Sequence, residues 1–152
     1  MKKVNILLTE YGESHQNKVN KNIYRVCVPA IVFSLFGILW TLPSPINISP
    51  LFNWATVLII LSAIYYFFLS WQLAIGMLFN SVFMILILQW MDGFTVPLWQ
   101  IAVAIFIVAW IGQFIGHHIE GKRPSFFRDI QFLLIGPVWI LADVYKTFHL
   151  RY

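Results

Sequence analysis

The sequence predicts an all-α integral membrane protein with four transmembrane helices and a C-terminal re-entrant or interfacial helix. Its apolar fraction is 60% and its charged fraction is 11%, whereas soluble domains average about 25% charged residues. From Val26 to Gly116 the only charged residue is Asp92, and a charge at the bilayer centre costs about 2.5–3.5 kcal/mol. A soluble fold would need polar faces in this region. We therefore expect one membrane domain over residues 1–152, with no nucleic-acid partner.

Polar and proline-rich breaks divide the apolar region into four runs. The segments 43–50 (PSPINISP) and 91–97 (MDGFTVP) break helices, and SWQ at 70–72 is a weaker break. Five tryptophans fall near the proposed ends, as an interfacial aromatic belt requires. Each run is close to the length of about 20 residues that a spanning helix needs. The predicted spans are 26–42, 52–70, 72–90 and 98–116.

A fifth apolar run covers residues 130–145 and is short for a span. The sequence IGP at 135–137 would kink it, and Asp143 lies near its end. The run either crosses the membrane or forms a re-entrant or surface-lying helix. We predict the second.

Basic residues predict the orientation. Lysine and arginine residues precede the first span and follow the fourth, whereas the loops at 43–52 and 91–97 contain neither. The positive-inside rule then places both basic segments in the cytosol, at a bacterial inner membrane or the endoplasmic reticulum. The predicted parts are the cytosolic segment 1–25, the spans in 26–116, the cytosolic segment 117–129, and the helix and tail 130–152.

Four crossings would bring histidines from distant parts of the chain to one membrane face. His15 precedes the first span, and His117 and His118 follow the fourth. On a continuing helix, Gln113, His117 and Glu120 share a face, whereas His118 is rotated by about 100°. Two histidines and a carboxylate resemble the facial triad of non-haem iron oxygenases. The alternative is that they are polar anchors at the interface.

Close helix packing is also predicted near these histidines. Gly112 and Gly116 form a small-xxx-small pair, which lets another helix approach closely.

Two blocks of sequence carry a family resemblance. They are YGESHQNKVNKNIYRVCVP at 11–29 and QFIGHHIEGKRPSFFRDIQFLLIGP at 113–137. Their order, spacing and intervening apolar spans resemble the 2-hydroxy fatty acid dioxygenase family of small membrane proteins. The resemblance implies an Fe(II)-dependent α-oxidation in which O2 removes C1 from a 2-hydroxy long-chain fatty acid, leaving an acid one carbon shorter.

The resemblance also implies a set of site residues. His15 and His117 match the histidines thought to hold iron, and Tyr24 stands where the family has a second histidine. Tyrosine can also ligate iron. On a straight helix positions 15 and 24 would face opposite ways, but the turn-prone segment 17–22 could bend the chain there. The resemblance and the residue pattern together give His15, His117 and Glu120 as catalytic candidates. The predicted metal ligands are these three with His118 and Tyr24. Arg123, Lys122 and Lys21 are predicted to bind the substrate, and Asn17, Asn20 and Gln113 to support the metal ligands.

Two other functions stay open on the sequence. The chain could be a non-catalytic membrane protein that binds lipid or a protein partner, including a second copy of itself. It could also be a zinc-dependent membrane hydrolase built on the same histidines. The metal content of the purified protein separates these alternatives from an iron enzyme.

Overall fold

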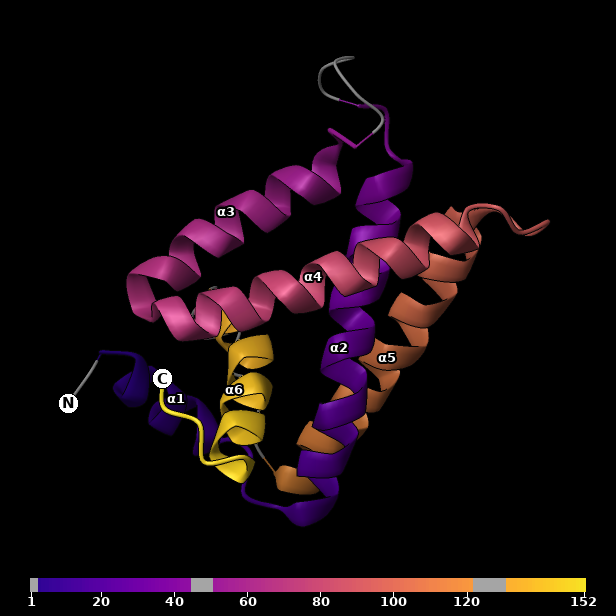
Figure 1. The fold of residues 1–152 in the computed structure, drawn as a ribbon. Helices are drawn as coiled ribbons and strands as arrows, with labels where there is room; N and C mark the ends of the chain where they lie inside the picture. The colour runs from indigo at the N-terminus through magenta and orange to yellow at the C-terminus, as the bar shows by residue number, and fades with distance from the viewer. Residues whose placement is uncertain (1–2, 45–50, 122–130) are drawn as a thin grey trace.

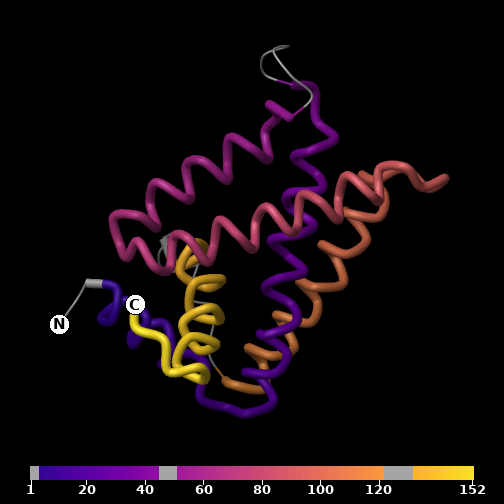
Figure 2. Tube along the Cα trace, in the orientation of Figure 1, coloured from indigo at the N-terminus to yellow at the C-terminus, as the bar shows by residue number. Residues whose placement is uncertain are grey.

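The computed structural model describes residues 3–44, 51–121 and 131–152, and within these ranges all regular structure is helical. Figures 1 and 2 show the arrangement. The helices are α1 (Lys3–Gly12), α2 (Lys18–Thr41), α3 (Trp54–Leu69), α4 (Trp71–Met91), α5 (Leu98–Glu120) and α6 (Gln131–Thr147).

Helices α2 and α5 form an antiparallel pair, so that the start of α2 lies beside the end of α5 (Figure 1). Glycines make this pairing close. A Cβ atom on Gly112 would lie 2.6 Å from Cys27 Sγ, and one on Gly116 would lie 2.5 Å from Asn20 Oδ1. The predicted close approach at this glycine pair is therefore confirmed.

Helices α3 and α4 form a hairpin whose only break is Ser70. This residue ends α3, and its side chain accepts a hydrogen bond from the Leu73 N–H at the start of α4. Both helices contact α2. The short SWQ break predicted from the sequence is therefore confirmed. A buried apolar cluster joins the hairpin to α2 and α5 through Phe36, Ala55, Met84, Leu88 and Leu98.

Helices α1 and α6 pack together, and in Figure 1 they lie to the left of α2, whereas α5 lies to its right. Arg25 of α2 forms an ion pair with Asp143 of α6 at 2.5 Å. The Tyr66 hydroxyl donates a hydrogen bond to the Leu134 carbonyl, which ties α3 to α6. Apolar side chains of α1 and α6 belong to one buried cluster, which includes Val4, Leu7, Leu8, Ile135, Val138 and Ala142.

Three of the described helices are long and apolar enough to cross a membrane: α2, α4 and α5. Helix α3 is apolar but has only 16 residues, which is short of the about 20 that a crossing needs. The prediction of four spans is therefore not confirmed. Large apolar side chains point outward from this part of the fold, including Phe68 and Phe79, which are 85% and 77% exposed. Such a surface suits contact with lipid.

Helix α6, with 17 residues, is not among these three helices. It contains Pro137, as the sequence suggested. A re-entrant or interfacial position for it stays a prediction.

Candidate metal and substrate site

A sharp turn between α1 and α2 positions His15. Helix α1 ends at Gly12, whose carbonyl accepts a hydrogen bond from the His15 N–H at 3.0 Å. Helix α2 starts after Asn17, whose side chain accepts from the Val19 N–H at 2.8 Å as an N-cap. The turn folds His15 back over the first part of α2, so its ring centroid lies 4.4 Å from that of Tyr24. Positions 15 and 24 are brought together as expected, but the bend lies at residues 13–17 and not in the predicted segment 17–22, because Asn17 caps α2 and residues 18–22 are already helical.

The last turn of α5 positions His117. This helix ends at Gly121, which adopts the left-handed conformation (φ 71°) that glycine accommodates readily. His117 is buried and His118 is exposed, as the rotation between neighbouring helical residues predicted. The rings of His15 and His117 make an edge contact with their centroids 5.1 Å apart. The structure thus brings together the two histidines that the sequence paired.

The hydrogen bonding of His15 fixes its tautomer. Its Nδ1 lies 3.2 Å from the Tyr11 carbonyl oxygen, which can only accept, so Nδ1 carries the hydrogen and Nε2 carries a lone pair. Burial lowers the pKa of His15 to about 4, so the ring is neutral at physiological pH. Neither His15 Nε2 nor His117 Nδ1, both buried, has a hydrogen-bond partner among the described residues. Two neutral, partnerless imidazole nitrogens suit a metal ion.

Two tyrosines extend this cluster. The hydroxyls of Tyr11 and Tyr24 share a hydrogen bond of 2.6 Å, and the Tyr11 ring stacks on His15 at 4.9 Å. Burial raises the pKa of Tyr11 well above its usual value, which keeps its hydroxyl protonated. A Cβ atom on Gly136 would lie 2.4 Å from the Tyr24 hydroxyl oxygen. Gly136 therefore leaves the space that the tyrosine pair occupies.

Three further residues, Tyr11, Gly136 and Trp139, lie at the site although the sequence did not predict them there. The Trp139 ring lies 5.6 Å from Tyr24 and 5.7 Å from His15. Tyr11 opens the first signature block, and Gly136 lies in the IGP sequence of the second. Their positions within the two blocks were the signals in the sequence that could have identified Tyr11 and Gly136 as site residues.

Glu120 makes hydrogen bonds that the sequence did not predict, and its role as a metal ligand stays a prediction. Its carboxylate accepts hydrogen bonds from the backbone N–H groups of Gln16 (2.8 Å) and Asn17 (2.9 Å). It also accepts from the Asn20 side-chain amide at 3.0 Å. A carboxylate beside a helix N-terminus is stabilising. Glu120 thus connects the end of α5 to the turn that carries His15. Asn17 and Asn20 take part in the same hydrogen-bond network.

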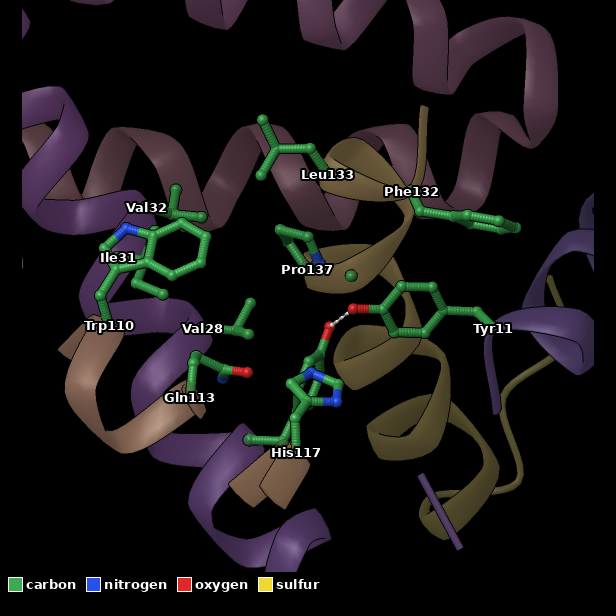
Figure 3. A pocket seen from close by; sticks show the side chains of 12 residues that line it. Tyr11, Val28, Ile31, Val32, Trp110, Gln113, His117, Phe132, Leu133 and Pro137 are labelled. Atoms are coloured by element: carbon green, nitrogen blue, oxygen red, sulfur yellow. Dashed lines mark hydrogen bonds between the residues drawn. The ribbon is translucent and has the colours of Figure 1, made fainter. Parts of the chain in front are cut away.

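A small cavity is lined by His117 and by the two tyrosines, Tyr11 and Tyr24 (Figure 3). Its volume is about 40 Å³, which is enough for a few water-sized molecules at about 10–15 Å³ each. Gln113 reaches it from α5, and the amide nitrogen of this buried side chain has no acceptor within the described parts of the chain. The walls are otherwise largely apolar and include Val28, Ile31, Val32, Trp110, Leu133 and Pro137.

The donor set fits a metal in part. His15 and His117 offer two nitrogens, but residues 3–44, 51–121 and 131–152 contain no group of three or more His, Cys, Asp or Glu side chains that could hold an ion. His118 is exposed, and the Glu120 oxygens accept the bonds described above. The Tyr24 hydroxyl is the other candidate donor beside the two rings.

The predicted substrate-binding cations are not assembled around this cavity. Lys21 is half-buried and does not line it. Lys122 and Arg123 lie outside the described residues.

Comparisons with known proteins agree with the two signature blocks. The family model described as 2-hydroxy-palmitic acid dioxygenase Mpo1-like matches residues 1–148. The 2-hydroxy-palmitic acid dioxygenase MPO1 of Saccharomyces cerevisiae is 29% identical over 135 residues, covering 88% of this chain and 74% of the yeast protein. No solved structure matches significantly. Because the family model covers nearly the whole chain, the chain belongs to the Mpo1-like family of 2-hydroxy-palmitic acid dioxygenases.

Proposed function

We propose that this protein is a membrane dioxygenase that removes C1 from 2-hydroxy long-chain fatty acids, with Fe(II) as its cofactor. In this reaction the C1–C2 bond breaks, C1 leaves as CO2, and C2 becomes the carboxyl carbon of an acid one carbon shorter. The substrate gives up four electrons, and O2 accepts them with water as the other product. The family membership and the yeast relative's name support the substrate class.

The single observation that carries the proposal is the buried pair of His15 and His117. The two rings are in contact, and each carries a buried nitrogen without a partner among the described residues. His117 lines the cavity, and His15 is held in the metal-binding tautomer by the Tyr11 carbonyl. These two rings would hold the iron. Few protein ligands suit this chemistry, because O2 and the substrate need open coordination positions. Bound Fe(II) would supply O2 activation and a binding position for the substrate's oxygens.

Protein groups around the cavity are suited to the polar head of the substrate. The Gln113 amide, which lacks an acceptor in the described structure, would donate to a carboxylate or hydroxyl oxygen. Only one of the Tyr11 and Tyr24 hydroxyls donates within their shared bond. The other hydroxyl therefore has a hydrogen to donate to a bound molecule. We assign this pair to orienting the substrate rather than to holding the ion.

Membrane placement follows from the same reasoning. A fatty acid keeps its tail in lipid and its carboxylate at the headgroup level. Basic residues flanking the apolar runs support a site at the cytosolic surface of a bacterial inner membrane or the endoplasmic reticulum. Lys21, Lys122 and Arg123 would then favour an anionic substrate near this surface.

The test is turnover by purified protein in lipid nanodiscs. With Fe(II) and O2, 2-hydroxypalmitate should give an acid one carbon shorter and an equal amount of CO2, and His117→Ala should give neither. Iron-loaded protein that produces no shortened acid would refute the proposal.

A non-catalytic, lipid-binding member of the family is the second candidate. The lack of a group of three or more conventional ligands among the described residues favours it. Metal analysis separates the possibilities: bound iron supports the dioxygenase, no stoichiometric metal supports the lipid-binding protein, and zinc supports a hydrolase.

A further inference from the structure

The cavity lined by His117 is too small for a fatty acyl chain. Its volume of about 40 Å³ holds only a few water-sized groups, such as those of a polar head. A long tail must therefore leave this cavity through one of its walls. Figure 3 shows Val32, Leu133 and Pro137 at the end of the cavity away from His117, and these side chains are apolar. The tail has its most favourable exit there.

A second cavity begins at that wall. It lies between α2, α4 and α6, has a volume of about 180 Å³, and shares Val32 and Pro137 with the first cavity. Asn80 is its only polar lining residue among the described residues. The other lining residues are Pro29, Met77, Met84, Ile140, Leu141 and Val144.

Two prolines explain why the helices do not close this space. Pro29 lies inside α2 and Pro137 inside α6, and both line the second cavity. A proline inside a helix clashes with the carbonyl four residues earlier and bends the helix. Two such bends on facing helices oppose continuous side-chain packing between them.

We infer that the cavity between α2, α4 and α6 binds the acyl chain of the substrate, with Val32 and Pro137 forming the passage from the reacting head. This inference rests on the proposed function and specifies where its substrate lies. The tail gains little free energy on moving from lipid to an apolar cavity, because both surroundings are apolar. The cavity would instead discriminate between substrates by the length and shape of their acyl chains. Met77 and Met84 suit this role because methionine side chains adapt to flexible chains.

Blocking the passage tests the inference through chain-length preference. Val32→Trp would fill the passage, and Val26→Trp is the matched control because Val26 lies on the same helix and is 71% exposed. We expect Val32→Trp to lower kcat/KM for 2-hydroxypalmitate about tenfold or more relative to 2-hydroxybutanoate, since overpacking of this kind is costly. Iron content should not change. An unchanged ratio between the two substrates would overturn the inference.

Cross-linking tests the same inference without turnover. A 2-hydroxypalmitate analogue with a mid-chain diazirine is irradiated with the full-length protein in nanodiscs, and the labelled residues are mapped by mass spectrometry. Labels on Met77, Met84 or Leu141 that excess 2-hydroxypalmitate removes would support the inference. Labels confined to outward residues such as Phe79, or removed equally well by plain palmitate, would overturn it. If wild-type protein is labelled in the cavity but shortens no substrate, the proposed function fails while the chain-binding site stands.

Discussion

Glu120, the last residue of α5, accepts a hydrogen bond from the backbone N–H of Asn17, the N-cap of α2, at 2.9 Å. This bond joins the two signature blocks where the start of α2 lies beside the end of α5, close to His15 and His117. It is supported by the bonds from Gln16 and Asn20 to the same carboxylate. Glu120 thus holds the His15 turn in place against the end of α5, which makes it a positioning residue.

Glu120→Gln tests this positioning role. An amide NH2 would face one of the backbone N–H donors, leaving it without an acceptor, so we expect a loss of about 1–3 kcal/mol in folding free energy. The thermal midpoint should fall by about 2–4 °C per kcal/mol, with weaker but measurable iron binding. Glu10→Gln, at an exposed position of α1, is the control and should change neither quantity. Complete loss of iron at unchanged stability would instead make Glu120 a ligand.

His117→Ala should remove iron binding and all shortening of 2-hydroxypalmitate, because it deletes one of the two partnerless imidazoles. The neighbouring variant His118→Ala is a matched control, since His118 is exposed. It should keep near wild-type iron content, measured by mass spectrometry of the metal. Equal iron loss in both variants would contradict the assignment.

Tyr24→Phe should lower kcat/KM without removing iron, because the hydroxyl is bonded to Tyr11 and serves the substrate. Stability should fall by about 1–3 kcal/mol, since the Tyr11 hydroxyl loses its partner. Tyr66→Phe also deletes a buried hydroxyl, one that donates to the Leu134 carbonyl instead. It should destabilise similarly and leave kcat/KM unchanged. Loss of iron in Tyr24→Phe alone would identify Tyr24 as a ligand.

Gly116→Ala should loosen the α2–α5 pair. The new methyl group would lie 2.5 Å from Asn20 Oδ1, and the Asn20 amide is bonded to Glu120. We expect a cost of about 1–3 kcal/mol, measured by thermal unfolding in detergent. Gly93→Ala, whose nearest contact would be an ordinary 3.5 Å, should have a much smaller effect. Equal effects would show that this packing is not tight.

The stability of the metal-free protein should depend on His15 between about pH 6.5 and pH 4. The pKa of His15 is lowered by burial to about 4, so in this range the unfolded chain binds a proton that the folded chain does not. Its contribution to stability is therefore complete above pH 6.5 and is lost as the pH falls towards 4. Thermal midpoints across this range should fall less steeply for His15→Gln than for wild type. The exposed control His149→Gln should keep the wild-type slope, and identical slopes for all three would disprove the contribution.

Local sequence signals predicted most helix positions but missed some ends. The proline-rich segment 43–50 falls between α2 and α3, and the Asp-Gly segment 91–97 separates α4 from α5, as predicted. Helix α2 nevertheless begins at Lys18, well before the predicted Val26, because Asn17 caps it and polar residues continue the helix beyond its apolar part. Helix α5 likewise continues to Glu120, where Gly121 ends it. Apolar composition indicates only the apolar part of a helix. The capping residues beyond that part, Asn17 and Gly121, were therefore not used to predict the helix ends.

The pairing of His15 with His117 was predictable because the chain was expected to return to one membrane face. The contribution of α6 was not. Gly136 and Trp139 reach the site only through the packing of α6 against α1 and α2, which no local spacing encodes. The Glu120 bonds were missed for a similar reason, because a carboxylate near histidines suggests a ligand until the backbone donors around it are known.

X-ray absorption at the iron edge tests the central claim most directly, because it counts the imidazoles bound to the metal. Iron-loaded wild-type protein should show two, and His15→Ala and His117→Ala, where they retain any iron, should each show one. A wild-type spectrum without imidazole, or one that neither substitution changes, would contradict a shared iron site at these two histidines.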